Sequence, residues 1–175
     1  LRAAAAKYKV ATQMGNQGHS NDGARDVVEL VRAGTIGPIR EVHAWTDRPI
    51  WPQGMDRPKD SDPVPKHIHW DLWLGPMPAR PYHAKTYHTF NWRGWWDFGT
   101  GALGDMACHV VDTAFWALDL RHPTSIESVC EGIKPEAGPN WSIITYDFPA
   151  RGDLPPVKLT WYDGKKFPPL ELAEK

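Results

Sequence analysis

The chain has 175 residues, of which 41% are hydrophobic and 23% charged, and its formal net charge at pH 7 is −1. Such a composition is typical of a soluble globular protein with a substantial core. The absence of a long basic run argues against nucleic acid as a partner, and no stretch reaches the roughly 18 apolar residues of a membrane span. The 10 Trp and 17 Pro are many for this length, and Trp-rich loops either stack on sugar or nucleotide rings or pack against one another.

The amino-terminal stretch begins inside a helical pattern. Residues 1–7 predict the tail of a helix, Lys9–Met14 a short strand, and Gly15–Ser20 a tight turn. No apolar core of adequate length follows the first charge, so the stretch is not a secretory signal. We therefore expect the chain to be a piece of a longer one.

A helix and a second strand follow. The helix is predicted to begin after Ser20 or Asn21 as its N-cap and to end at Ala33, before Gly34. Alternating side chains over Ile39–Arg48 predict a strand. Strand, helix and strand together give a βαβ pattern, unless the second strand belongs to a different sheet.

Residues 49–91 carry proline after proline, which excludes regular sheet and long helix. A short helical turn is predicted at 68–74, where Gly75-Pro76 ends it. The many aromatic side chains argue against disorder, and structureless loops of this length are uncommon in compact chains unless they are functional. We interpret this insert as an ordered lid or wall over a site.

The central stretch, residues 92–118, is a glycine-rich aromatic loop that leads into an amphipathic helix. On that helix Asp105 and His109 stand four residues apart, so they share a face about 6 Å apart along the axis. Asp112 lies on nearly the same face. A carboxylate and an imidazole on one helical wall suit general acid-base chemistry on a bound polar ring. The opposite stripe is predicted to face the core and consists of Ala107, Val110, Val111, Ala114, Phe115 and Leu118.

A purely structural interpretation of the same pair is also open. Asp105 follows Gly104 in the first turn, where a carboxylate complements the helix N-terminus. His109 could simply be hydrogen-bonded to Asp105 or Asp112.

The two cysteines, Cys108 and Cys130, do not form a disulfide framework. The stretch around Cys108 predicts a buried helical position, so we expect free thiols. This is compatible with a cytoplasmic protein, and the periplasm remains the alternative.

Three further strands are predicted at Ser125–Ile133, Trp141–Phe148 and Val157–Asp163, separated by Pro and Gly. With the helices gathered on one side, the chain predicts an α+β fold with a mixed, largely antiparallel open sheet. An open, one-sided sheet usually needs covering, so we expect a homo-oligomer that associates through the bare face.

Residues 101–112, Gly-Ala-Leu-Gly-Asp-Met-Ala-Cys-His-Val-Val-Asp, resemble the signature helix of the glucose-fructose oxidoreductase, inositol dehydrogenase and rhizopine-catabolism (Gfo/Idh/MocA) family. The family pattern is Gly-Gly-x-Leu-x-Asp-x-x-x-His-x-x-Asp. Gly34–Trp45 is similar to the Gly-x-Ile-Gly entry to the family's large substrate-domain strand. Val10–Ser20 is similar to the last strand of its nucleotide domain and the following turn. The resemblance implies that residues 1–20 are the remnant of a Rossmann domain and 21–175 a truncated substrate-binding and oligomerisation domain.

The resemblance also implies an activity, namely hydride transfer between NAD or NADP and a sugar, cyclitol or related polyol. His109 then matches the acid-base residue that takes the proton from the reacting hydroxyl. Asp105 matches a residue that holds a substrate hydroxyl or orients the imidazole. Further matches are Asn16 and Gln17 at the cofactor, and His19, Trp92 and Arg93 at the substrate.

Two family motifs are not found in these residues, the Gly-x-Gly-x-x-Gly phosphate loop and a Glu-Lys-Pro motif with a catalytic Lys. We expect both to lie upstream of Leu1, and we expect the 175 residues alone to be inactive.

Three other functions compete with the dehydrogenase. A glycosidase of the same family type would use bound NAD for transient oxidation of the sugar. A non-catalytic carbohydrate-binding or oligomerisation module would use Trp95, Trp96 and the open sheet. A metal site could draw on His67 and His69, with His83, His88, His109 or Cys108 as further ligands, although no metal is our expectation.

Overall fold

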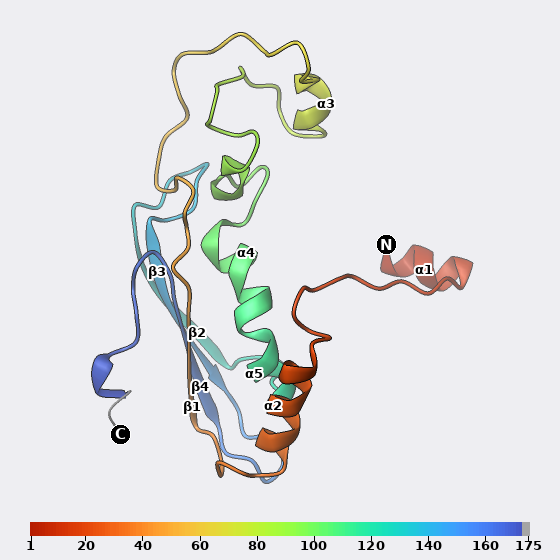
Figure 1. The fold of residues 1–175 in the computed structure, drawn as a ribbon, viewed down its shortest axis with the longest axis vertical. Helices are drawn as coiled ribbons and strands as arrows, with labels where there is room; N and C mark the ends of the chain where they lie inside the picture. The colour runs from red at the N-terminus through yellow and green to blue at the C-terminus, as the bar shows by residue number, and fades with distance from the viewer. Residues whose placement is uncertain (173–175) are drawn as a thin grey trace.

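The computed structural model describes residues 1–172, and its centre is a four-stranded sheet (Figure 1). The strands are β1 (Glu41–Trp45), β2 (Ser125–Glu131), β3 (Trp141–Phe148) and β4 (Val157–Tyr162), in the order β1-β4-β3-β2. β1 runs parallel to β4, and the other two pairs are antiparallel. The predicted mixed, largely antiparallel α+β sheet is therefore confirmed. β1 is shorter than the predicted Ile39–Arg48, because the ladder with β4 covers only its middle.

Helices cover one face of this sheet, as predicted. They are α2 (Asp22–Arg32), α4 (Gly101–Val110) and α5 (Asp112–Ala117). Within residues 1–172, the opposite side of the sheet carries no α-helix, only the carboxyl-terminal segment with the short 3-10 helix η2 (Leu170–Leu172) (Figure 1). Trp161 is fully buried and Leu159 is 1% exposed at the centre of the core, beneath Val111 and Leu118 of the helical layer. Burying each large apolar side chain contributes about 1.5–3 kcal/mol, so this contact fixes the helices on the sheet.

The predicted central helix is two helices, divided at Val111. Its apolar stripe was predicted too broadly at Val110, which is 37% exposed, whereas Phe115 does face the sheet and packs edge-on against the buried Phe148 ring at 5.5 Å. Successive helical residues lie about 100° apart, so Val110 and Val111 cannot both face the sheet. The prediction that Cys108 is buried is also wrong, because this residue is exposed and lines an open pocket between the helices and the sheet.

The amino-terminal segment contains α1 (Arg2–Tyr8), which confirms the predicted helix tail. No residue of α1 is buried, and the helix lies away from the rest of the chain (Figure 1). The predicted strand Lys9–Met14 is wrong, as is the βαβ unit that depended on it. These residues have no neighbouring strand among those described, and a strand requires a partner for its backbone groups.

The proline-rich insert is folded around its aromatic rings. It contains the predicted short helix, α3 (Trp70–Leu74), and a 3-10 helix, η1 (Asn91–Gly94). Trp95 is fully buried and Tyr87 is 1% exposed, with Trp70, Trp73 and others packed around them. Ion pairs Arg57–Glu136 and Lys134–Asp56 join the insert to the β2–β3 connection. At the other end of the chain, η2 (Leu170–Leu172) precedes residues 173–175, which belong to the predicted substrate domain but lie outside the described residues.

A buried carboxylate closes the end of the sheet at β4. Asp163, 3% exposed, accepts hydrogen bonds from the Ser142 backbone N–H (2.6 Å), the Ser142 hydroxyl (2.6 Å) and the Trp161 indole (2.8 Å). Three donors on one buried acceptor make it a strong local constraint, because each donor would otherwise be left unsatisfied.

We predict that Asp163→Ala lowers the free energy of unfolding by about 2–4 kcal/mol, because it orphans these buried donors. Urea unfolding followed by tryptophan fluorescence measures the effect. Asp153→Ala, at an exposed position, is the matched control and should change stability by less than about 0.5 kcal/mol. Equal, small effects of the two substitutions would contradict the role given to Asp163.

Candidate functional site

Asp105 lies near the start of α4 and is held by Arg93. The Nε of Arg93 donates a hydrogen bond to Asp105 Oδ1 at 3.1 Å, and the two side chains are 25% and 26% exposed. The guanidinium also lies 4.2 Å from the Phe90 ring centre and 4.4 Å from that of Trp92. Three residues that the sequence assigned to substrate, Arg93, Trp92 and Asp105, therefore come together.

Glycine makes this approach of loop and helix possible. A Cβ at Gly99 would lie 2.5 Å from the backbone oxygen of Arg93, which no real side chain tolerates. A Cβ at Gly94 would lie 2.3 Å from the backbone oxygen of Pro52. The glycines of this loop thus place Arg93 against the first turns of α4.

His109 is oriented by the backbone and not by an acid. Its Nδ1 lies 3.0 Å from the carbonyl oxygen of Gln17. A carbonyl can only accept a hydrogen bond, so this contact requires a proton on Nδ1, and in the neutral ring the lone pair is then on Nε2. Within residues 1–172, His109 makes no hydrogen bond to Asp105 or Asp112. The purely structural interpretation required a hydrogen bond between His109 and one of these carboxylates, and the structure does not contain it.

The turn at residues 15–20 is attached to the helical wall by two further contacts. The Asn16 amide donates to the Cys108 carbonyl at 2.7 Å. His19 Nδ1 lies 2.7 Å from Asp112 Oδ2, and its ring stacks on Trp116 at 4.8 Å. The Asn16 amide nitrogen, predicted to be at the cofactor, is thus engaged with the helix.

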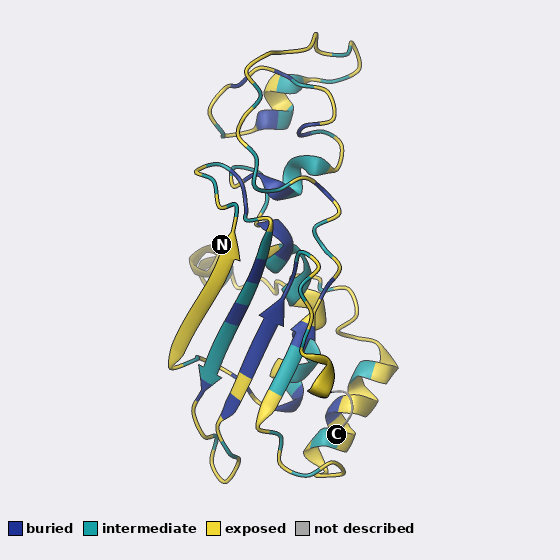
Figure 2. Cartoon of the chain, turned by 90° about the vertical axis from the view of Figure 1, so that its left-hand side faces the viewer, coloured by how far each residue is buried: buried dark blue, intermediate teal, exposed yellow. Residues whose placement is uncertain are grey.

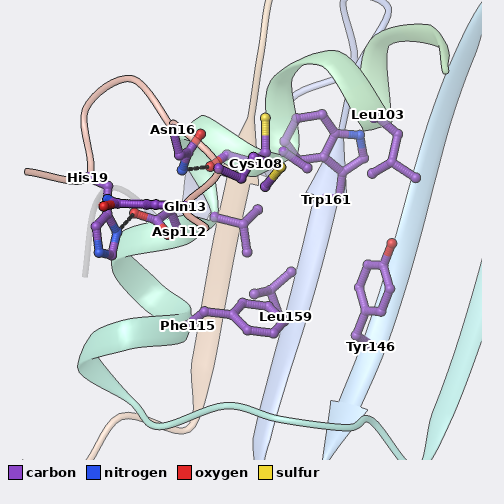
Figure 3. A pocket seen from close by; sticks show the side chains of 14 residues that line it. Gln13, Asn16, His19, Leu103, Cys108, Asp112, Phe115, Tyr146, Leu159 and Trp161 are labelled. Carbon is purple, nitrogen blue, oxygen red and sulfur yellow. Dashed lines mark hydrogen bonds and ion pairs between the residues drawn. The ribbon is translucent and has the colours of Figure 1, made fainter. Parts of the chain in front are cut away.

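A pocket of about 760 Å³ lies beside this wall, between the helices and the sheet (Figure 3). Its floor comes from the sheet and its side from α4 and α5, with a polar rim from the turn; the main contributors are Tyr146, Leu159, Trp161, Leu103, Cys108, Phe115, Asn16, His19 and Asp112. The walls are mostly apolar, and burial raises the pKa of the Tyr146 hydroxyl above its usual range. Such a concave, largely apolar space with a few polar groups is typical of a ligand site.

The predicted site residues divide between two neighbouring faces of the helical wall. Asn16 and His19 line the pocket. Trp92, Arg93, Asp105, Gln17 and His109 do not line it and lie on the adjoining face. Asp112, which holds His19, also lines the pocket.

Sequence reasoning missed two residues of this region. Asp112 was placed on the helix face but not among the site residues, and its partner His19 is 93 positions away in the sequence, so no local spacing could reveal the pair. Tyr146 was placed only within a strand. The alternation of β3 does indicate which side of the sheet it faces, because Ile144 and Phe148 on the same side are buried.

The donor set suits hydroxyl groups and a planar amide more than phosphate. Imidazole, carboxylate, guanidinium and amide groups line one wall, and no glycine-rich phosphate loop accompanies them. Among residues 1–172, no group of three or more His, Cys, Asp and Glu side chains could hold a metal ion. No helix in the described part of the chain is both long and apolar enough to cross a bilayer.

We predict that Asp112→Ala speeds amide hydrogen exchange in residues 15–21 by about three- to tenfold, because the turn loses one of its attachments to the helices. Mass spectrometry of the corresponding peptide measures the change. Asp119→Asn, which neutralises an exposed carboxylate paired with Arg121 at 3.6 Å and suits the left-handed backbone at this position (φ 49°), is the control. Unchanged exchange in Asp112→Ala would show that the His19–Asp112 contact does not hold the turn.

The comparison with known families agrees with the fold. Residues 26–153, most of the chain, match the model of the Gfo/Idh/MocA oxidoreductase family described as its C-terminal alpha/beta domain. No curated protein matches the chain. The matched segment contains the helical wall, the insert and three of the four strands. The chain therefore belongs to the Gfo/Idh/MocA oxidoreductase family and carries its C-terminal alpha/beta domain.

Proposed function

We propose that this chain is the substrate-binding part of a nicotinamide-dependent oxidoreductase that acts on a sugar, cyclitol or related polyol. The observation that carries the proposal is the exposed imidazole of His109, whose Nδ1 is engaged by the Gln17 carbonyl while its Nε2 has no hydrogen-bond partner within residues 1–172. An oriented imidazole with an available lone pair is a competent general base near neutral pH. Membership of an oxidoreductase family supports the reaction class.

The wall supplies two functions to a bound hydroxylated substrate. His109 Nε2 takes the proton of the reacting hydroxyl group, and the Gln17 carbonyl stabilises the imidazolium that results. Asp105 accepts a hydrogen bond from a neighbouring hydroxyl through its exposed carboxylate edge, while Arg93 fixes its position. NAD or NADP, when bound, accepts or supplies the hydride at the same carbon.

The chain's own residues fit only one end of that cofactor. Gln17 is exposed beside His109 and suits a contact with the nicotinamide amide, whereas the Asn16 amide nitrogen is engaged with the Cys108 carbonyl and leaves only its side-chain oxygen for such a contact. A pyrophosphate requires a glycine-rich loop at a helix N-terminus, which these residues do not provide. We propose that a nucleotide-binding domain supplies it, with residues 1–20 as that domain's last part, and that the 175 residues alone do not turn over substrate.

We predict that His109→Ala lowers kcat by a factor of roughly 10² to 10⁴ in the protein that includes the nucleotide-binding domain, because proton transfer is lost while cofactor binding is kept. NADH absorbance and cofactor titration measure the two quantities. His122→Ala, which removes another exposed imidazole, should leave kcat unchanged. An unaltered kcat in His109→Ala would remove this residue from catalysis. Sugar release from an aryl glycoside without net NADH would favour the glycosidase over the dehydrogenase.

We also propose that the bare face of the sheet forms a homo-oligomer. Trp45, Tyr162, Ile143 and Val129 are successive register partners, so they form one row across all four strands on the face away from the helices. Figure 2 looks onto this face, where Trp45 is 50% and Val129 63% exposed. Tyr162, between them, is only 7% exposed, so the apolar surface open to a partner lies at the two ends of the row, at Trp45 and Val129. Exposed apolar side chains of this kind are what a symmetric dimer buries.

Val129→Arg is expected to shift the chain from dimer to monomer in sedimentation velocity, because the charge would have to be buried within the interface. Ile126→Arg, on the same edge strand but on the other face, is the control and should leave the assembly intact. A dimer that survives Val129→Arg, or a wild-type monomer at all concentrations, would contradict the proposed interface.

A further inference from the structure

A second hollow lies in the insert, apart from the pocket beside the helical wall. It has a volume of about 360 Å³ and opens between α3, the turn that follows α3, and residues 92–98. Its lining includes Trp73, Met77, Trp92, Phe98 and the carboxylate of Asp97. We call it the Trp73 hollow. Nothing in the proposed chemistry uses it.

The aromatic walls of the Trp73 hollow are braced from behind. Trp73 stacks on Trp70 at 4.8 Å with an interplanar angle of 12°. Phe98 packs against Trp73 at 4.8 Å and against Tyr87, itself 1% exposed, at 5.8 Å. Trp73 and Phe98 are nevertheless only partly buried. Rigid rings with an accessible surface can bind a ligand at little cost in side-chain entropy.

Asp97 places one polar group in this aromatic surface, and a buried arginine holds it there. The Arg80 side chain is 1% exposed and pairs with Asp97 Oδ2. Its guanidinium also lies 4.8 Å from the Phe98 ring centre and 5.5 Å from that of Tyr87. The Asp97 side chain is 37% exposed, and its Oδ1 accepts no hydrogen bond within the part of the chain described.

The charge balance selects the class of ligand. Arg80 neutralises Asp97, so the Trp73 hollow offers a strong hydrogen-bond acceptor without a net negative charge. A cationic ligand gains little from such a pair, whereas a neutral ring with hydroxyl groups can donate to Oδ1 and lay its C–H face on an indole. The volume lies within the range of about 300–1,000 Å³ found for small-molecule sites.

We propose that the Trp73 hollow is a carbohydrate subsite that binds a pyranose ring beyond the reacting one. Trp92 connects the two regions, because it lines the hollow and also contacts the guanidinium of Arg93, the partner of Asp105. A substrate with two linked rings would place one ring at the helical wall and the other against Trp73 and Trp92. The inference rests on the proposed function only for the choice of carbohydrate as the substrate class.

Titration of the 15N-labelled 175-residue chain with methyl pyranosides tests the subsite directly. The panel contains the gluco-, galacto- and manno-configured methyl pyranosides and a β-linked glucose disaccharide. At least one of these probes is expected to shift the indole signals of Trp73 and Trp92 with saturation, while Trp96, 44% exposed and outside the hollow, does not move. Trp116, stacked on His19, reports binding at the helical wall independently.

Substitutions in and outside the Trp73 hollow distinguish a loss of ligand binding from a loss of folding. Asp97→Asn keeps the shape of the side chain and is expected to weaken binding about tenfold, as expected for loss of a charged acceptor. Trp92→Leu should weaken binding at least as much, and Trp96→Leu should leave it unchanged. Near-ultraviolet circular dichroism checks that each variant is folded. If Asp97→Asn does not fold, the wild-type indole shifts decide the question.

Absence of a saturable Trp73 shift with every probe would overturn the subsite. So would a larger Trp73 shift with tetramethylammonium chloride than with any pyranoside, which would make the hollow a cation site. A Trp116 shift without a Trp73 shift would leave the proposed function standing and remove only the subsite. A Trp73 shift combined with full activity of His109→Ala would support the subsite and contradict the catalytic role proposed for His109.

Discussion

The helical wall formed by α4 and α5 is held on two sides at once, and the candidate site depends on this. On one side Val111 and Leu118 pack on Trp161 and the rest of the sheet core. On the other side the turn at residues 15–20 attaches through Asn16 to the Cys108 carbonyl and through His19 to Asp112. The wall is therefore immobilised on one side by apolar packing against the sheet. On the other side it is held by hydrogen bonds to a segment more than 90 residues away in the sequence.

This double attachment decides the chemistry of His109. An isolated helix would leave the imidazole free to rotate and to exchange its proton between the two nitrogens. The Gln17 carbonyl removes that freedom, because it accepts only from a protonated Nδ1. The insert contributes in the same way to Asp105, since the close approach at Gly99 sets the position of Arg93. Two loops distant in sequence thus arrange a base and a hydroxyl-binding acid on one wall.

The sequence predicts the elements of this fold better than their contacts. Periodicity and glycine spacing located α2, α3, the central helix and the three antiparallel strands, because these signals are local. The strand at Lys9–Met14 failed, because apolar residues favour a strand only where a neighbour is present to pair with it. Cys108 was misplaced because one turn of helix decides between core and solvent, and composition does not fix that rotation.

The candidate site was predictable only in part for the same reason. The spacing of Asp105 and His109 on one helix is a local fact, and the structure keeps both accessible. The identity of their partners, Arg93 and the Gln17 carbonyl, depends on tertiary contacts that no spacing encodes. Which of the predicted residues line the pocket depends on the side of α4 that faces the sheet, and this orientation is not encoded in the spacing.

The central claim is that the Gln17 carbonyl determines which nitrogen of the neutral His109 ring carries the proton. Two-bond 15N–1H correlation NMR of the histidine side chains, recorded at a pH where the imidazole is neutral, measures this directly. The account predicts that His109 is in the Nδ1–H form, with Nε2 showing the 15N shift of an unprotonated nitrogen. A His109 ring in the Nε2–H form, or an averaged mixture of the two tautomers, would contradict it.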